Sequence, residues 1–151
     1  MPGRDCISQY CSTTWSDADA VALSANVGDC ASQAVWECYM LLLAVTTWQQ
    51  TLIDVSGSMQ VIGDAEGVLK AVLARRAKAP TINKLVMEIQ LVLGPSMQDI
   101  YATHIWSEDN EIADMLSRRS EGAELPSSCS TASEAAVVRP RLRFLKQRNG
   151  R

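Results

Sequence analysis

The feature that most constrains the fold is a long stretch, residues 31–53, that contains neither proline nor glycine. It is rich in leucine, alanine and methionine, so it predicts one long helix. Glu37 is its only charged residue, and the residues one helical turn away include Ala34 and Leu41. A carboxylate on so apolar a helix needs a partner or a metal ion if it is buried. The alternative is that Glu37 lies near the helix start on a solvated edge, where the helix dipole favours a negative charge.

Shorter strand and helix patterns alternate along the rest of the chain. Residues 16–28 are small and polar, and Asp17 and Asp19 suit turns or a helix cap. The order strand, helix, strand, helix, helix, strand, helix predicts an α/β fold in which helices cover a sheet. The predicted strands lie within residues 6–15, 59–62 and 99–106, and the further helices at residues 65–77, 81–93 and 109–118.

The composition changes after residue 119. The chain has 14 basic and 17 acidic residues, of which six basic and three acidic lie in residues 121–151, so the tail carries +3 and the first 120 residues carry −6. We predict one domain over residues 1–120 and a disordered linker with a basic C-terminal tail over residues 121–151. Because residues 1–120 are acidic, the domain would need a partner or a local basic patch to bind nucleic acid. The residues of that patch would be Arg139, Arg141, Arg143 and Lys146.

Cysteine spacing and hydropathy bound the class of protein. The five cysteines are odd in number and include no C-x-x-C pair, which indicates free thiols in an intracellular protein rather than a zinc site or a disulfide scaffold. The N-terminus has no apolar signal segment, and the longest apolar run, residues 38–45, is far shorter than the ~20 residues of a membrane helix. We predict a protein of the cytoplasm or nucleus that is not secreted and has no membrane partner.

Two candidate site residues follow predicted strands. Asp64 either caps the helix that it opens or binds a metal ion at the carboxyl end of a strand, where α/β folds place their sites. His104, the only histidine, shares a strand face with Ile100 and Ala102, so it is either a core residue or part of a site.

A third carboxylate lies on the last predicted helix. Asp114 and Asn110 are one turn apart there, on a different face from Met115 and Leu116. The alternative is a solvated helix face. Together, Glu37, Asp64 and Asp114 suit phosphodiester hydrolysis, because a pair of divalent ions needs a cluster of carboxylates and Mg²⁺ prefers oxygen ligands.

Residues 104–118 read HIWSEDNEIADMLSR. This run resembles the final motif of retroelement ribonuclease H domains, H-I-P-G-x-x-N-x-x-A-D-x-L-S-R, with Trp106 and Ser107 in place of proline and glycine. Residues 28–48 resemble the family's first long helix, residues 61–73 the strand and helix that carry its second aspartate, and residues 76–93 a helix of DIRS- and gypsy-type elements. The resemblance covers residues 6–119. The residues that match the final motif are His104, Ile105, Asn110, Ala113, Asp114, Leu116, Ser117 and Arg118.

The resemblance implies a ribonuclease H-like mixed sheet flanked by helices, and cleavage of the RNA strand of an RNA–DNA hybrid during reverse transcription. Glu37, Asp64 and Asp114 would bind Mg²⁺ or Mn²⁺. His104 would assist proton transfer or product release, and Asn110 would support the site. The reverse transcriptase segment of the same polyprotein is the expected protein partner.

One part of the family pattern is missing. The family's first strand carries an aspartate in a D-A-S-x-x-G-like motif that bridges both metals, and residues 1–30 contain no such motif. They are also too few for three strands of ~5–6 residues with their turns, so we expect the first two strands to be absent and the strand before Asp64 to lack one neighbour. Weak or no nuclease activity follows. The open alternatives are an enzyme fragment that an upstream segment completes, a non-catalytic module that binds nucleic acid or protein, and an unrelated small α/β protein that carries the motif by accident.

Overall fold

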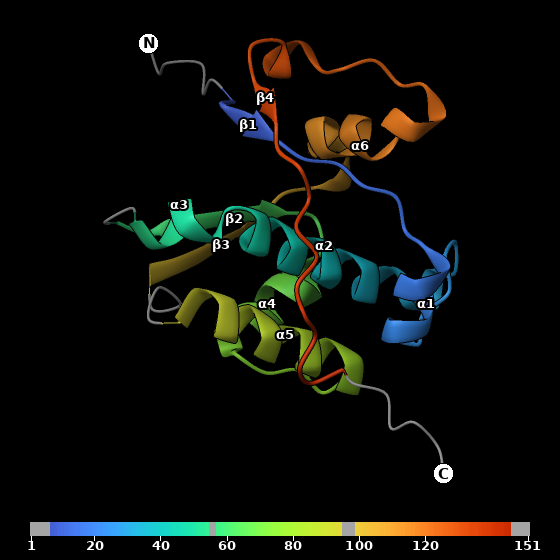
Figure 1. The fold of residues 1–151 in the computed structure, drawn as a ribbon, viewed down its shortest axis with the longest axis vertical. Helices are drawn as coiled ribbons and strands as arrows, with labels where there is room; N and C mark the ends of the chain where they lie inside the picture. The colour runs from blue at the N-terminus through green and yellow to red at the C-terminus, as the bar shows by residue number, and fades with distance from the viewer. Residues whose placement is uncertain (1–6, 55–56, 95–98, 146–151) are drawn as a thin grey trace.

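A long helix forms the centre of the molecule, which is seen here in a computed structural model that describes residues 7–54, 57–94 and 99–145 (Figure 1). The helix predicted over residues 31–53 is divided into α2 (Gln33–Thr47) and α3 (Gln49–Asp54), with the short turn η1 (Cys30–Ser32) before it. The break lies at Trp48, which has φ −103° and ψ 17°. Just before it, the Thr46 hydroxyl donates a hydrogen bond to the Leu42 carbonyl at 2.7 Å. This kind of bond bends helices, so two β-branched threonines and a bulky tryptophan end α2 earlier than its composition predicts.

Two parallel strands lie beside this helix. Strand β2 (Met59–Gly63) pairs with β3 (Ile100–His104) in a register that sets Gly63 opposite His104. Parallel strands need a long crossover, and here it contains α4 (Glu66–Ala74) and α5 (Pro80–Leu93). The ends of β2, β3, α4 and α5 lie within three residues of the predicted ends.

The core lies between α2, α4 and α5. The apolar stripe of each helix faces the other two, as expected for amphipathic helices that share one core. The largest side chains with less than 2% exposure include Leu42 and Leu43 on α2, and Leu85, Ile89 and Leu93 on α5.

A second pair of strands lies apart from β2 and β3 (Figure 1). Strand β1 (Gln9–Tyr10) pairs in parallel with β4 (Ser133–Glu134). The described part of the chain therefore has two separate parallel pairs, whereas the resemblance implied one mixed sheet. The α/β class is confirmed, but a single mixed sheet is not present, because no described strand lies between β1 and β2 to join the pairs.

Helix α1 (Asp17–Leu23) forms where only turns or a cap were predicted. Ser16 and Asp19 make a capping box, in which each side chain accepts a hydrogen bond from the other residue's backbone amide. The S-x-x-D spacing is a signature of such a box, so the sequence contained the signal for this helix.

The C-terminal segment is the largest departure from the sequence prediction. Residues 121–145 were predicted to be a disordered linker and tail, but they form the turn η5 (Ser127–Cys129), β4, and a stretch that crosses α2 and α5 (Figure 1). The Val138 amide donates to the Thr47 hydroxyl at 3.0 Å, and Glu88 accepts from the Phe144 amide at 2.6 Å. The polar composition of this segment predicts disorder, but a few apolar side chains are enough to hold it against the core. Those packed against the core are Val137, Leu142 and Leu145.

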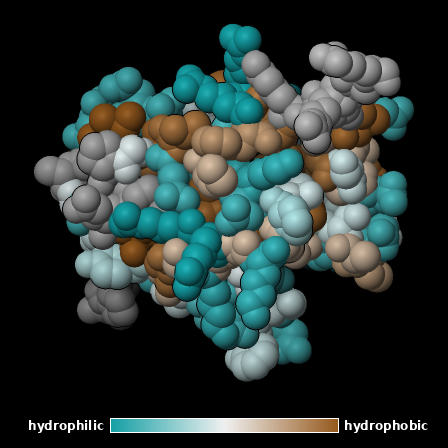
Figure 2. Space-filling view, turned by 90° about the horizontal axis from the view of Figure 1, so that it is seen from below, coloured by the Kyte–Doolittle hydropathy of each residue, from teal (hydrophilic) through white to brown (hydrophobic). Residues whose placement is uncertain are grey.

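The remaining helical segments are η3 (Ser107–Asp109), α6 (Glu111–Ser117) and η4 (Arg119–Glu121). The apolar residues Ile112, Met115 and Leu116 predict a core face on α6, but none of the residues of this helix is buried, and Ile112 is 40% exposed. No helix in the described ranges is long and apolar enough to cross a bilayer. The molecule seen from below in Figure 2 has hydrophobic patches among hydrophilic residues, and α4 and α5 each carry an exposed leucine, Leu73 and Leu91.

Candidate functional site

Three separate elements bring the predicted carboxylates to one hollow. Glu37 lies on the second turn of α2, Asp64 directly follows β2, and Asp114 lies on α6. All three line a hollow of about 250 Å³, which we call the carboxylate hollow. Asp64 is there because it ends a parallel strand, the position at which α/β sheets open their sites. The other lining residues are Gln33, Ser107, Asn110, Ala113 and Ser117.

Asn110 connects two of these elements. It lies between η3 and α6, and its side-chain amide donates to the Asp64 carboxylate at 3.1 Å. The alternative that Asp64 caps α4 does not hold, because the N-cap residue of that helix is Ala65. The supporting role of Asn110 stays a prediction, and its contact with Asp64 is the geometry on which that role would depend.

Glu37 and Asp114 have polar partners on their own helices. The Gln33 side chain donates to Glu37 at 2.9 Å, one turn away on α2. Arg118 lies 3.2 Å from Asp114 through both its Nε and its Nη2. The side chains of this ion pair are more than half exposed, so it contributes little to stability. Sequence reasoning missed Gln33, although its i,i+4 spacing from Glu37 is the usual one for such a pair.

His104 lies outside the carboxylate hollow. It ends β3, its side chain is exposed, and its ring meets that of Trp106 edge-on with centroids 5.4 Å apart. The alternative of a buried core histidine is therefore wrong. His104 is not among the residues that line the carboxylate hollow.

The oxygen donors suit Mg²⁺ or Mn²⁺, but their arrangement does not hold a metal as it stands. No group of three or more histidine, cysteine, aspartate or glutamate side chains in the described ranges is close enough to hold one ion. Glu37, Asp64 and Asp114 instead each contact a neighbouring amide or guanidinium. The three carboxylates therefore share one hollow without converging on a single point.

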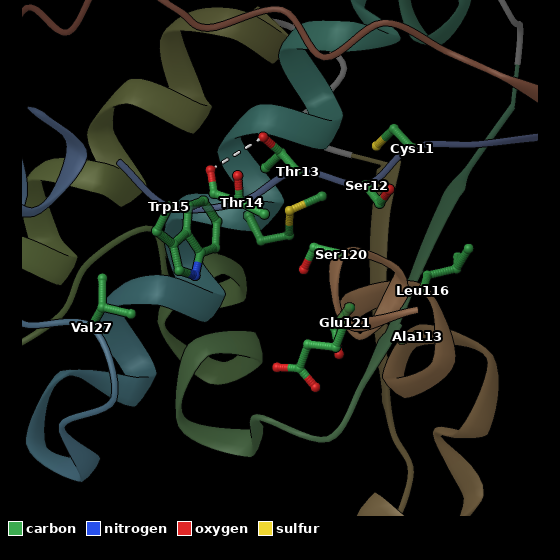
Figure 3. A pocket seen from close by; sticks show the side chains of 12 residues that line it. Cys11, Ser12, Thr13, Thr14, Trp15, Val27, Ala113, Leu116, Ser120 and Glu121 are labelled. Atoms are coloured by element: carbon green, nitrogen blue, oxygen red, sulfur yellow. Dashed lines mark hydrogen bonds between the residues drawn. The ribbon is translucent and has the colours of Figure 1, made fainter. Parts of the chain in front are cut away.

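Two further hollows adjoin this surface. The β2 hollow, about 260 Å³, lies between β2 and α2 and shares Glu37, Asp64 and Asn110 with the carboxylate hollow. The α6 hollow, about 440 Å³, lies between α6 and residues 11–15 (Figure 3). Nothing in the sequence pattern pointed to it, because its walls are brought together only by the fold.

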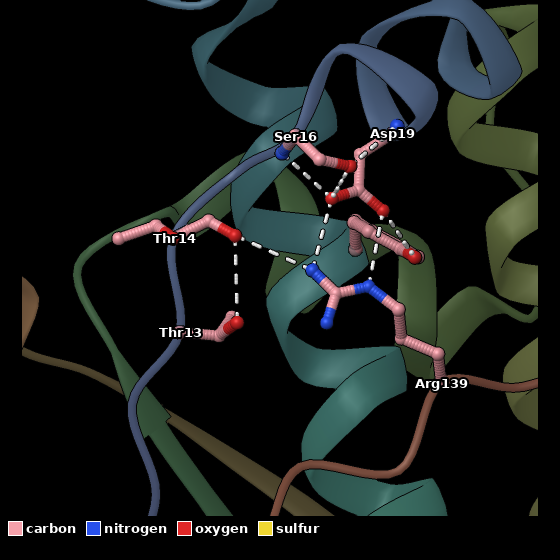
Figure 4. Close-up of polar contacts among 6 residues, drawn as sticks. Thr13, Thr14, Ser16, Asp19 and Arg139 are labelled. Atoms are coloured by element: carbon pink, nitrogen blue, oxygen red, sulfur yellow. Dashed lines mark hydrogen bonds and ion pairs between the residues drawn. The ribbon is translucent and has the colours of Figure 1, made fainter.

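The basic residues of the C-terminal segment are engaged in different ways. Arg139 binds the buried Asp19 with its Nη2 at 2.9 Å, and the same nitrogen donates to the Thr14 carbonyl at 3.3 Å (Figure 4). The Arg143 amide donates to Glu88, and the side chains of Arg141 and Arg143 are exposed. Arg139 could contact nucleic acid, as predicted, only if its ion pair with Asp19 opened. Lys146 lies outside the described residues.

Asp19 was noted in the sequence only as a turn or cap residue. Burial by itself raises its pKa, but hydrogen bonds from Arg139, from the backbone and hydroxyl of Ser16, and from Tyr39 outweigh burial and hold the pKa well below its usual range. The same surroundings, burial first and then the negative charge of Asp19, raise the pKa of Tyr39 to about 12. This cluster anchors the C-terminal segment to α1 and α2.

Comparison of the chain with family models, with curated proteins and with solved structures gives no match.

Proposed function

We propose that the chain is a ribonuclease H-like domain of a retroelement polyprotein, which engages RNA–DNA hybrids and cleaves them weakly or not at all by itself. The observation that carries this proposal is the meeting of Glu37, Asp64 and Asp114. These three residues come from distant parts of the sequence, they occupy the carboxylate positions of the family motifs, and they line a single hollow. A chance match to residues 104–118 gives no reason for the other two carboxylates to lie there as well.

The expected weakness has two causes. The family uses four carboxylates, of which the matching segments supply three. The three are also bound to Gln33, Asn110 and Arg118 rather than gathered around one point. We expect Mg²⁺ or Mn²⁺ to bind weakly, because the ion pair between Asp114 and Arg118 has to open first.

The test measures binding and cleavage of a labelled RNA–DNA hybrid in Mg²⁺ and in Mn²⁺. Glu37→Gln is the site variant, and Glu66→Gln is the matched control, since Glu66 is an exposed helical carboxylate that pairs with Lys70. We expect hybrid binding with slow cleavage, and any cleavage should be lost in Glu37→Gln and kept in Glu66→Gln. If the hybrid does not bind at ~0.1 M salt, or if both variants cleave alike, the proposal is wrong.

A second candidate is a module that binds nucleic acid without cleavage. It is favoured by the exposed side chains of Arg141 and Arg143. Deletion of the tail would remove packed residues, so the better test replaces both arginines by glutamine and measures hybrid affinity at two salt concentrations. Loss of two phosphate contacts would flatten the salt dependence. Hybrid binding that needs both arginines, without cleavage in either metal, would favour this candidate.

The reverse transcriptase segment of the same polyprotein remains the proposed protein partner.

A further inference from the structure

The three hollows adjoin one another beside α2. The carboxylate hollow and the β2 hollow share Glu37 and Asp64, and the carboxylate and α6 hollows share Ala113 and Ser117. Met40 lines both the β2 hollow and the α6 hollow. We call the whole the strand cleft. It passes between β2 on one side and residues 11–15 with α6 on the other.

One wall of the strand cleft is the free edge of β2. Among the described strands, β2 pairs only with β3. The Gly63 carbonyl accepts from the Ile105 amide at 3.0 Å, so Gly63 faces β3. Because successive residues of a strand direct their backbone groups to opposite sides, Gln60 and Ile62 direct theirs away from β3. Such an edge is a template for another strand.

The floor and the opposite wall are apolar. Met40, Leu41 and Ala44 lie on the cleft side of α2 and are only half-buried. On α6, Ala113 and Leu116 line the cleft, and this helix has no buried residue (Figure 3). The apolar side of α6 therefore faces an open cleft instead of a core, so an occupant with apolar side chains would cover it.

One end of the strand cleft is acidic. Glu37, Asp64 and Asp114 lie there, and Glu121 lies further along. These three hollows are lined by no lysine or arginine among the described residues, although Arg118 pairs with Asp114 and Arg119 lines a further hollow beside α6. Complementarity of charge therefore calls for an occupant that carries a positive side chain at this end.

We propose that the strand cleft binds an extended segment of a separate polypeptide, which pairs with the free edge of β2. Its alternate apolar side chains lie on Met40, Leu41 and Leu116. A lysine or arginine at its end lies beside Glu37 and Asp64. This inference does not depend on the nuclease proposal, because the pairing needs neither metal nor nucleic acid.

The experiment uses fluorescent nine-residue peptides of alternating threonine with valine, isoleucine or leucine, each ending in lysine or in glutamate at either terminus. Binding to the full chain is measured by fluorescence anisotropy. The test variant is Ile62→Pro, which removes an outward amide from an edge strand without removing a bond to β3. The matched control is Ala102→Pro, which makes the same change on the outer edge of β3. Circular dichroism checks that both variants are folded, and hydrogen exchange follows the amides of β2.

We expect lysine-ended peptides to bind at least ~10-fold more tightly than glutamate-ended ones, since a charge pair of this kind is worth about one tenfold step. Ile62→Pro should weaken binding at least ~10-fold and Ala102→Pro less than ~2-fold, and bound peptide should slow exchange at Gln60 and Ile62. Absence of binding by every peptide would overturn the proposal. Equal binding by the two proline variants, or a dimer of the free chain that Ile62→Pro abolishes, would overturn it as well, the last by identifying a second copy as the occupant.

Discussion

The ion pair between Asp19 and Arg139 joins α1 to the C-terminal segment, and we predict that its loss loosens that segment. Asp19 is 6% exposed and accepts hydrogen bonds from Ser16, Tyr39 and Arg139. Asp19→Asn keeps the size of the side chain and removes its charge. Arg139→Gln removes the charge of the partner and shortens the side chain.

The expected cost follows from burial. Hydrogen bonds to a charged group contribute ~1.5–3 kcal/mol, so Asp19→Asn should lower the free energy of unfolding by about 2 kcal/mol. The Arg139 side chain is 41% exposed, and solvent screening reduces the cost of Arg139→Gln to ~1 kcal/mol. The two changes remove the same contact, so their coupling energy should be ~1 kcal/mol.

Urea denaturation of the wild type, both single variants and the double variant measures this coupling. The matched control is the same cycle on Asp114 and Arg118, an exposed pair for which we expect less than ~0.5 kcal/mol. Hydrogen exchange at residues 135–145 should quicken in the Asp19 variant and not in the control. A coupling energy below ~0.3 kcal/mol, or no change in exchange, would refute the reasoning that this pair anchors the segment.

The pH dependence has a definite sign. The pKa of Asp19 is lower in the folded than in the unfolded chain, so the unfolded chain takes up the proton first as pH falls. The stabilisation is therefore complete above the ordinary aspartate pKa of ~3.9 and is lost as the pH drops further below it. Asp19→Asn should lack this share of the acid sensitivity, which urea denaturation at pH 7 and at pH 3 would measure.

Three further predictions concern stability and are tested by the same denaturation assay. Ser16→Ala removes the capping box of α1 and should cost ~1 kcal/mol, whereas no loss would mean that packing alone holds the helix. Leu43→Ala should lower the free energy of unfolding by ~3 kcal/mol because Leu43 is fully buried. Leu91→Ala, at a leucine that is 49% exposed, should lower it by less than ~1 kcal/mol. Equal losses would contradict the assigned core. Glu88→Leu leaves the Phe144 amide without its acceptor and should cost ~1–3 kcal/mol with faster exchange of that amide, and unchanged exchange would show that the bond is not formed.

The elements set by local pattern were predictable from the sequence. Helix α5 begins at Pro80, which favours the first turn of a helix, and ends at Leu93 before a glycine. Strands β2 and β3 were predicted because residues 59–62 and 99–106 alternate in polarity. The end of α2 at Thr47 was not predicted, since helix propensity sums over many residues and a single bond from Thr46 does not change the sum.

The candidate site was predictable in part. The motif order suggested that Glu37, Asp64 and Asp114 share one place, and they line one hollow. His104 does not line that hollow, because the last residue of β3 directs its side chain elsewhere and the ring meets Trp106. The strand pattern placed His104 on the face of Ile100 and Ala102, but it could not show whether that face borders the hollow, since this depends on how distant elements pack.

By itself, the sequence determined the α/β class and the positions of the main helices and of the β2 and β3 segments. It also singled out Glu37, Asp64 and Asp114 as candidate site residues. Each of these results depends on residues within a few positions of one another. Only the tertiary structure decided which segments meet. It placed Arg139 on Asp19, set the C-terminal segment across α2 and α5, and brought the apolar side of α6 to the hollow beside residues 11–15. The physical reason is that burial and charge pairing act through space, and partners 120 residues apart leave no periodic trace along the chain.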